Sequence, residues 1–116
     1  VLDSNFNLKL TDFGLACKLT TGFCDGSDKV GTLQYMAPEV ILEHRYKPEV
    51  ADLFSIGVII FMLLTGKAPF EHASTKDKWY KAMVNRGFKA IKAENFSGGH
   101  ELTSGPYSTE FKDLIN

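Results

Sequence analysis

Apolar residues dominate one segment of the chain, from Pro48 to Thr65, and leave it almost no polar face. Pro48 and Glu49 suit a helix start, and Gly66 suits a helix end. A helix that is apolar on nearly every side belongs in a protein interior unless it crosses a membrane. Its most apolar stretch, Leu53 to Leu64, has 12 residues, whereas a bilayer needs about 20. The pattern therefore predicts a buried central helix over 48–65 and no membrane span.

The first third of the chain has a different pattern. Residues 1–11 alternate apolar and polar positions around the turn-rich stretch Asp3 to Asn7, which predicts a short β-hairpin. Residues 14–30 show no sustained period and contain turn residues, so we expect a long, mobile surface loop. Pro38 and Glu39 then predict a short helix that ends near Glu43.

Two further helices are predicted towards the end of the chain. Ser74 and Asp77 fit the capping-box pattern ahead of a helix over 75–86, which Gly87 stops. Ser108 fits the N-cap of a last helix over 108–116. The sequence contains no internal repeat.

Composition excludes several classes of protein. The 116 residues carry 13 basic and 14 acidic side chains, which fits one ordinary globular domain at most. Because a nucleic-acid binder needs a basic excess, we expect no nucleic-acid partner. Cys17 and Cys24 lack metal-ligand spacing with any histidine, so we expect free, reduced thiols and an intracellular, cytoplasmic location.

The tripeptide Asp12-Phe13-Gly14 places a carboxylate at the end of the predicted hairpin. A carboxylate held by a rigid strand suits a hard cation such as Mg²⁺. It also suits a plain turn, in which Asp caps the strand end and Gly supplies a positive φ. The tripeptide by itself leaves both interpretations open.

Three further motifs follow it in order, at residues 31–39 (Gly-Thr-Leu-Gln-Tyr-Met-Ala-Pro-Glu), 52–57 and 66–70. The series resembles the C-lobe of a eukaryotic protein kinase, from the Asp-Phe-Gly motif through Ala-Pro-Glu to the central apolar helix. The resemblance implies an α+β protein-kinase-like fold, of which this chain is a mainly α, partial C-lobe with a short N-terminal hairpin. Residues 1–116 would be a partial kinase domain, with 12–39 as its activation segment.

The resemblance also implies roles for residues of the site. Asp12 would bind Mg²⁺ and, with Phe13 and Gly14, form the cofactor site for ATP. Gly31, Thr32 and Tyr35 would line the loop that receives a protein substrate. Thr32 and Tyr35 favour Ser/Thr over Tyr specificity.

In the predicted activation loop, Asp28 stands where many kinases have a phosphorylatable Thr. A carboxylate carries about half the charge of a phosphoryl group, so Asp28 would replace phosphorylation, as in calcium/calmodulin-dependent kinases. A regulatory subunit or calcium sensor is then a possible partner. An ordinary solvated Asp fits equally well, and Ser27 is an alternative phosphosite.

Glu39 and Asp52 have implied structural roles. Glu39 would pair with an Arg late in the C-lobe, and Asp52, placed in the first turn of the apolar helix, would hold the catalytic loop. Interaction with its own helix end is the simpler role for Asp52. Trp79 and Tyr80 suit either the core or a docking face.

The parts that perform phosphoryl transfer lie upstream in that family: the Gly-rich loop, its lysine and the catalytic Asp. No catalytic residue is therefore predicted in this chain, and we expect the piece to be inactive and prone to aggregate when isolated. A pseudokinase lobe that serves as a scaffold is the alternative function. An unrelated helical interaction module would leave the ordered motifs unexplained.

Overall fold

The computed structural model describes residues 1–18, 22–25, 31–42 and 45–87. Within these residues the fold is mainly helical, with α1 (Pro38–Leu42), α2 (Pro48–Thr65) and α3 (Lys78–Arg86). Strands β1 (Cys24–Asp25) and β2 (Arg45–Tyr46) form a small antiparallel sheet, in which Cys24 pairs with Tyr46. The helix predicted over 108–116 lies outside the described residues.

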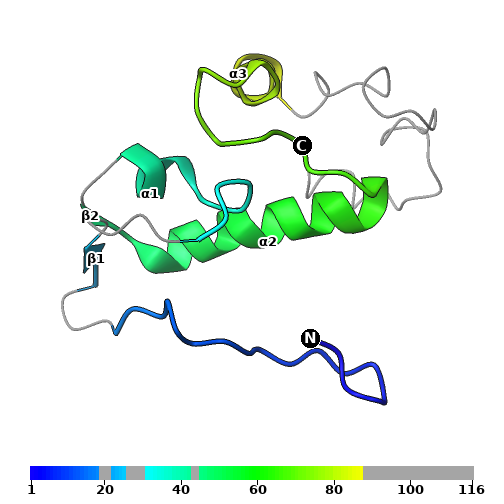
Figure 1. Cartoon of the computed structure of the whole chain (residues 1–116). Coiled ribbons are helices and arrows are strands. Elements are labelled where there is room, and N and C mark those ends of the chain that lie inside the picture. The colour runs from blue at the N-terminus through cyan, green and yellow to red at the C-terminus, as the bar shows by residue number, and fades with distance from the viewer. Residues whose placement is uncertain (19–21, 26–30, 43–44, 88–116) are drawn as a thin grey trace.

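Helix α2 is the organising element, and its bounds are those that the apolar pattern predicted. It ends at Gly66, whose positive φ of 72° lets its amide donate to the carbonyl of Met62 at 2.8 Å. In Figure 1, α1 and α3 lie on one side of α2, and the N-terminal segment runs along the other side.

One side of α2 carries the core. Val58, Phe70 and Ala73 form the buried cluster, and partly buried side chains from the 31–36 loop, α1, α2 and α3 pack against it. The Phe70 ring lies 5.9 Å from Phe54 and, edge to face, 5.3 Å from Tyr80. Aromatic pairs at these distances favour such geometries. Phe70 therefore joins α2 to α3.

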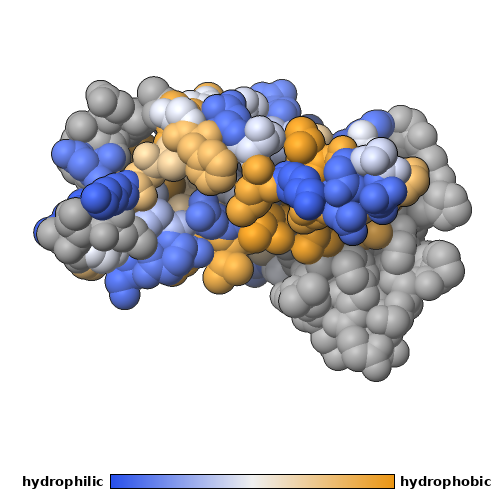
Figure 2. Space-filling view, turned by 90° about the horizontal axis from the view of Figure 1, so that it is seen from below, coloured by the Kyte–Doolittle hydropathy of each residue, from blue (hydrophilic) through white to orange (hydrophobic). Residues whose placement is uncertain are grey.

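The other side of α2 is exposed, which contradicts the prediction of a fully buried helix. Of its 18 residues, Ala51, Val58 and Phe61 are buried, while Leu53 is 68% and Leu63 is 80% exposed. Figure 2 shows apolar side chains gathered along the middle of the face seen from below. The sequence pattern reports how apolar the helix is, but the surrounding chain covers only part of it.

The expectation of no membrane span stays a prediction. That expectation considered the 12 residues from Leu53 to Leu64. The whole of α2 has 18 residues with a mean hydropathy of 1.8, and by length and composition such a helix could cross a membrane. Core helices of globular proteins meet the same criterion. The criterion alone therefore decides nothing about α2.

The N-terminal hairpin is reduced to a turn and one β-bridge. Leu2 and Leu8 form an isolated antiparallel bridge, and regular strands are absent from residues 1–18. The Asp3 carboxylate accepts hydrogen bonds from the backbone amides of Asn5 and Asn7 at 2.9 and 2.8 Å. The bonds from Asn7, above all, lower the pKa of Asp3. The predicted turn is therefore confirmed, with Asp3 as its organiser.

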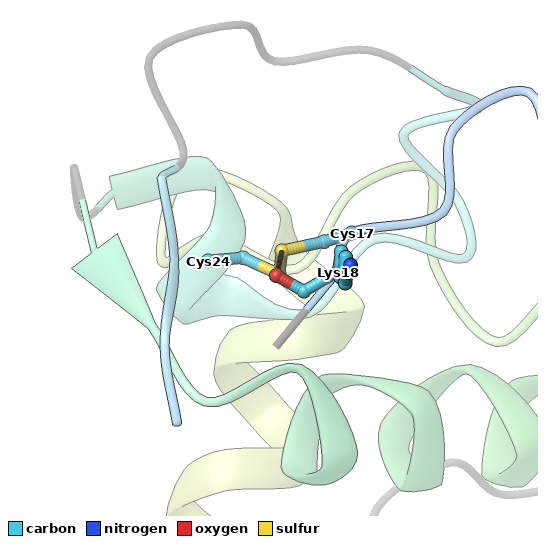
Figure 3. Close-up of a disulfide and its surroundings, with 3 residues drawn as sticks. All are labelled: Cys17, Lys18 and Cys24. Atoms are coloured by element: carbon cyan, nitrogen blue, oxygen red, sulfur yellow. Dashed lines mark hydrogen bonds between the residues drawn. A yellow bond between two sulfur atoms is a disulfide. The ribbon is translucent and has the colours of Figure 1, made fainter. Parts of the chain in front are cut away.

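The segment predicted as an unstructured loop contains β1 and a disulfide. Cys17 and Cys24 are bonded to each other, which contradicts the prediction of free thiols (Figure 3). Their Cα atoms lie 6.1 Å apart, within the range that a disulfide requires. The sequence pattern did not predict this bond, because the two cysteines lie in a stretch without a regular hydrophobic period.

Helix α3 begins three residues after the predicted start. Asp77 is its N-cap and accepts from the amides of Trp79 and Tyr80 at 2.8 and 3.0 Å. Ser74 instead stabilises the preceding turn, where it accepts from the amide of Lys76 at 3.3 Å. Burial raises the pKa of Asp77, but its amide hydrogen bonds outweigh burial and hold the pKa below its usual value.

Replacing Asp77 with Ala should therefore loosen the first turn of α3. Loss of an N-cap costs about 1 kcal/mol, so we expect the protection of the Trp79 and Tyr80 amides against hydrogen exchange to fall roughly fivefold at pH 7. Because the folded-state pKa is lowered, the capping contribution is present above the unfolded pKa and is lost as pH falls through the folded one. The difference between wild type and D77A should therefore shrink below about pH 4.

Ser74→Ala is the matched control, since it removes a hydroxyl from the same turn without touching the cap. We expect its effect on these amides to be small. Equal effects of the two substitutions would contradict the assignment of Asp77 as the N-cap.

Candidate functional site

Three separate stretches of the sequence meet around one cavity of about 560 Å³. Residues 12–17 form one wall, the 31–37 loop forms a second, and Tyr46 with the first half of α2 forms the third. The cavity thus brings together most residues that the resemblance assigned to the site. These residues are Asp12, Phe13, Gly31, Thr32, Tyr35 and Asp52.

Asp12 has a backbone conformation that differs from the predicted one. Its φ is +61°, whereas Gly14 is not in the left-handed region. Asp tolerates this region better than most residues, because its short side chain bonds locally. Here Asp12 Oδ1 accepts from the Gly14 amide at 3.3 Å.

Gly14 contributes space rather than a positive φ. A Cβ at this position would lie 3.3 Å from Asp12 Oδ1, closer than most real Cβ contacts. The absence of a side chain at Gly14 therefore lets the carboxylate fold back over the turn. Phe13, between them, is 71% exposed, so the described chain does not bury the ring that was assigned to the cofactor site.

The 31–36 loop is fixed to α2 by one side chain. Ser55 Oγ donates to the carbonyl of Tyr35 at 2.8 Å, with the Ala51 carbonyl as a longer alternative at 3.2 Å. Within the loop, the Tyr35 amide donates to the Thr32 carbonyl at 3.0 Å. No role was predicted for Ser55, although a hydroxyl in the middle of an apolar helix is a signal that could have found it.

Asp52 does not occupy the first turn of α2, where it was predicted. The acid of the first turn is Glu49. Because the field of a helix end fades within one turn, interaction with the helix dipole belongs to Glu49. Asp52 is exposed at the cavity instead.

Glu39 is half-buried on α1. Burial raises the pKa of Tyr80, and the negative charge of Glu39 raises it further. Glu39 thus lies close enough to α3 for its charge to be felt there. Ser27 and Asp28 lie outside the described residues.

A second cavity, also of about 560 Å³, lies between Gln34 and the start of α3. Glu71, His72 and Asp77 place possible metal ligands within 4.8 Å of one another there. However, the Asp77 carboxylate already accepts from the amides of Glu71, Trp79 and Tyr80. Trp79 packs against the core, as one of its two predicted roles requires, and also lines this cavity.

Comparison with known proteins decides the family. The family model of the protein kinase domain, which describes the sequences of that family, matches residues 1–116. The chain belongs to the protein kinase domain family. Its core helix α2 and its ordered motifs are therefore those of a kinase domain.

Similar kinases come from distant organisms. The chain is 42% identical over 94 residues to CBL-interacting serine/threonine-protein kinase 10 of Arabidopsis thaliana, covering 78% of this chain and 19% of the relative. It is 44% identical over 91 residues to serine/threonine-protein kinase 33 of Bos taurus, covering 73% and 17%. With cell cycle serine/threonine-protein kinase CDC5/MSD2 of Saccharomyces cerevisiae it shares 38% over 114 residues, covering 97% and 14%. The chain therefore spans less than a fifth of the length of these relatives.

In the kinase chain, replacing Ser55 with Ala should release the 31–36 loop from α2. A hydrogen bond of this kind contributes about 1 kcal/mol, so hydrogen exchange within residues 31–37 should become roughly fivefold faster. The matched control is Thr65→Ala, which removes another α2 hydroxyl bonded to the carbonyl four residues before it, that of Phe61. Equal acceleration in both variants would show that Ser55 acts on the helix and not on the loop.

Proposed function

We propose that this chain is part of a protein Ser/Thr kinase, which transfers the γ-phosphate of ATP to Ser or Thr hydroxyls of protein substrates. The observation that carries the proposal is the cavity shared by Asp12, Thr32 and Tyr35. These residues belong to motifs separated in sequence, so their convergence is a property of the fold. It places a carboxylate beside the loop expected to receive the substrate.

The carboxylate of Asp12 fits the Mg²⁺ that the family uses with ATP. It is exposed, and its hydrogen bond to Gly14 uses Oδ1. In the described residues, Oδ2 has no hydrogen-bond partner and can serve as a hard oxygen ligand. Bound Mg²⁺ with ATP would supply the transferable phosphoryl group and neutralise its charge. Phe13 and Gly14 would complete the cofactor site by shaping the turn.

Specificity for Ser and Thr rests on the 31–36 loop. Thr32 and Tyr35 line the cavity, and the similar kinases named above are all Ser/Thr kinases by name. We assign Gly31, Thr32 and Tyr35 to the substrate loop, and Glu39 and Asp52 to its support. Asp52, exposed at the same cavity, is placed to hold a neighbouring segment of a complete kinase.

Regulation is inferred from the same resemblance. Asp28 would act in place of a phosphorylated residue, with Ser27 as the alternative site. Some similar kinases are named for their interaction with CBL, which supports the proposal of a regulatory partner for this kinase. We retain an intracellular, cytoplasmic location as a prediction.

The exposed side of α2 supports the proposal that the chain works within a longer kinase. Leu53 and Leu63 present large apolar surfaces there, and such surfaces are normally covered. The Gly-rich loop, its lysine and the catalytic Asp would come from the rest of that protein. We therefore expect the 116 residues alone to be inactive.

A pseudokinase lobe acting as a scaffold is the second candidate. It would need neither a metal ligand nor a catalytic Asp, so the exposed Asp12 carboxylate favours the enzyme. The presence or absence of the catalytic Asp in the preceding coding sequence separates the two functions.

Replacing Asp12 with Asn in the complete protein should abolish phosphoryl transfer. The substitution keeps the shape but removes the charge that holds the metal, whose charge stabilisation amounts to several kcal/mol. We expect kcat/KM to fall about a thousandfold, measured with radiolabelled ATP and a generic Ser/Thr protein substrate. Thermal unfolding should be unchanged.

Asp3→Asn is the matched control, because Asp3 lies in the hairpin turn and outside the cavity. Its activity should equal that of wild type. Full activity of D12N would refute the assignment of Asp12, and an inactive wild type with intact fold would favour the scaffold.

A further inference from the structure

The Cys17–Cys24 disulfide spans the beginning of the predicted activation segment. Cys17 is exposed and lies in the cavity wall, five residues after Asp12. Cys24 is only 2% exposed and lies in β1. Figure 3 shows the two side chains turned towards each other, from the segment that follows Asp12 and from β1. The bond therefore links the wall of the site to the small sheet.

We propose that Cys17 and Cys24 are a reversible redox switch, in which oxidation fixes the activation segment and lowers kinase activity. The regulatory part of this inference rests on the proposed kinase function. The cross-link itself does not depend on that function.

Several contacts anchor the Cys24 end. Cys24 and Asp25 pair with Tyr46 and Arg45 of β2, which directly precedes α2. Phe23 is next to Cys24, and its ring lies under the Arg45 guanidinium. The guanidinium carbon is 4.6 Å from the centroid of the ring. Such a cation–π contact stabilises β1 against β2. Cys24 is thus a fixed point.

The Cys17 end has no comparable anchor. Its described neighbours 11–18 are all exposed and belong to no helix or strand. Oxidation would therefore transfer the rigidity of the β1–β2 sheet to the segment that carries Asp12. Such segments rearrange during substrate binding and product release. A kinase whose segment is fixed should therefore turn over more slowly.

Cys17 is exposed and Cys24 is buried, and this difference assigns their chemical roles. With a peroxide as oxidant, the Cys17 thiolate attacks an O–O oxygen and becomes a sulfenic acid, and the other oxygen leaves as water after protonation. The Cys24 thiol then attacks the Cys17 sulfur and releases a second water as the disulfide forms. Overall, two thiols lose two electrons and two protons, and one peroxide is reduced to two waters.

Reduction follows the same exposure. The thiolate of a dithiol reductant attacks Cys17 Sγ, Cys24 leaves as a thiol after protonation, and the second reductant sulfur closes its own disulfide to free Cys17. Cys17 Sγ lies 3.9 Å from the Lys18 carbonyl oxygen. In the disulfide this sulfur carries no hydrogen, but the freed thiol can donate to that oxygen.

The test uses the complete protein, treated with hydrogen peroxide and then with dithiothreitol. Peptide mapping by mass spectrometry should find Cys17 joined to Cys24 after peroxide and free after dithiothreitol. Oxidation should lower kcat roughly fivefold and slow hydrogen exchange in residues 12–18, and reduction should restore both. Cys17→Ser and Cys24→Ser should each keep their kcat and exchange rates under peroxide.

Other results would overturn the proposal. If peptide mapping does not find the pair, the switch does not exist. If the pair forms but kcat is unchanged, the disulfide is structural only. If the reduced protein has no kinase activity, the proposed function fails, and equal exchange of residues 12–18 in both redox states would then refute the lock independently.

Discussion

Packing against α2 is the interaction on which the rest of this structure depends. The helix is apolar on nearly all sides, and the residues around it cover one side of it. Val58 is buried beneath Phe70 and Ala73, which forces the chain after Gly66 to fold back along the helix. Phe70 then contacts Tyr80, so the position of α3 also follows from α2.

The candidate site follows from the same constraint. Ser55 reaches out from α2 to the carbonyl of Tyr35, and this bond sets the 31–36 loop beside the first half of the helix. Asp52 projects from α2 one turn earlier into the cavity that Asp12 and Thr32 share. The Ser55 hydrogen bond and the burial of Met36 and Ala37 thus assemble the site on the helix.

Sequence reasoning succeeded where local chemistry decides the structure. Pro48 and Gly66 marked both ends of α2, and the ordered motifs identified the residues that line the cavity. It failed where two residues offered the same chemistry, as with Ser74 and Asp77, which both suit an N-cap. It also failed for Cys17 and Cys24, because a stretch without a regular hydrophobic period carries no local signal that two cysteines will pair. The positive φ of Asp12 was missed because Gly14 was the more permissive residue nearby.

We infer that α2 is a kinase core helix whose exposed side is covered in the complete protein. Amide hydrogen exchange across residues 48–65 tests it most directly, measured on the 116-residue chain and on the complete protein. We expect weak protection and self-association in the chain alone, and strong protection of the same amides in the complete protein. A sharp monomer of the isolated chain, with α2 as strongly protected as in the complete protein, would contradict it.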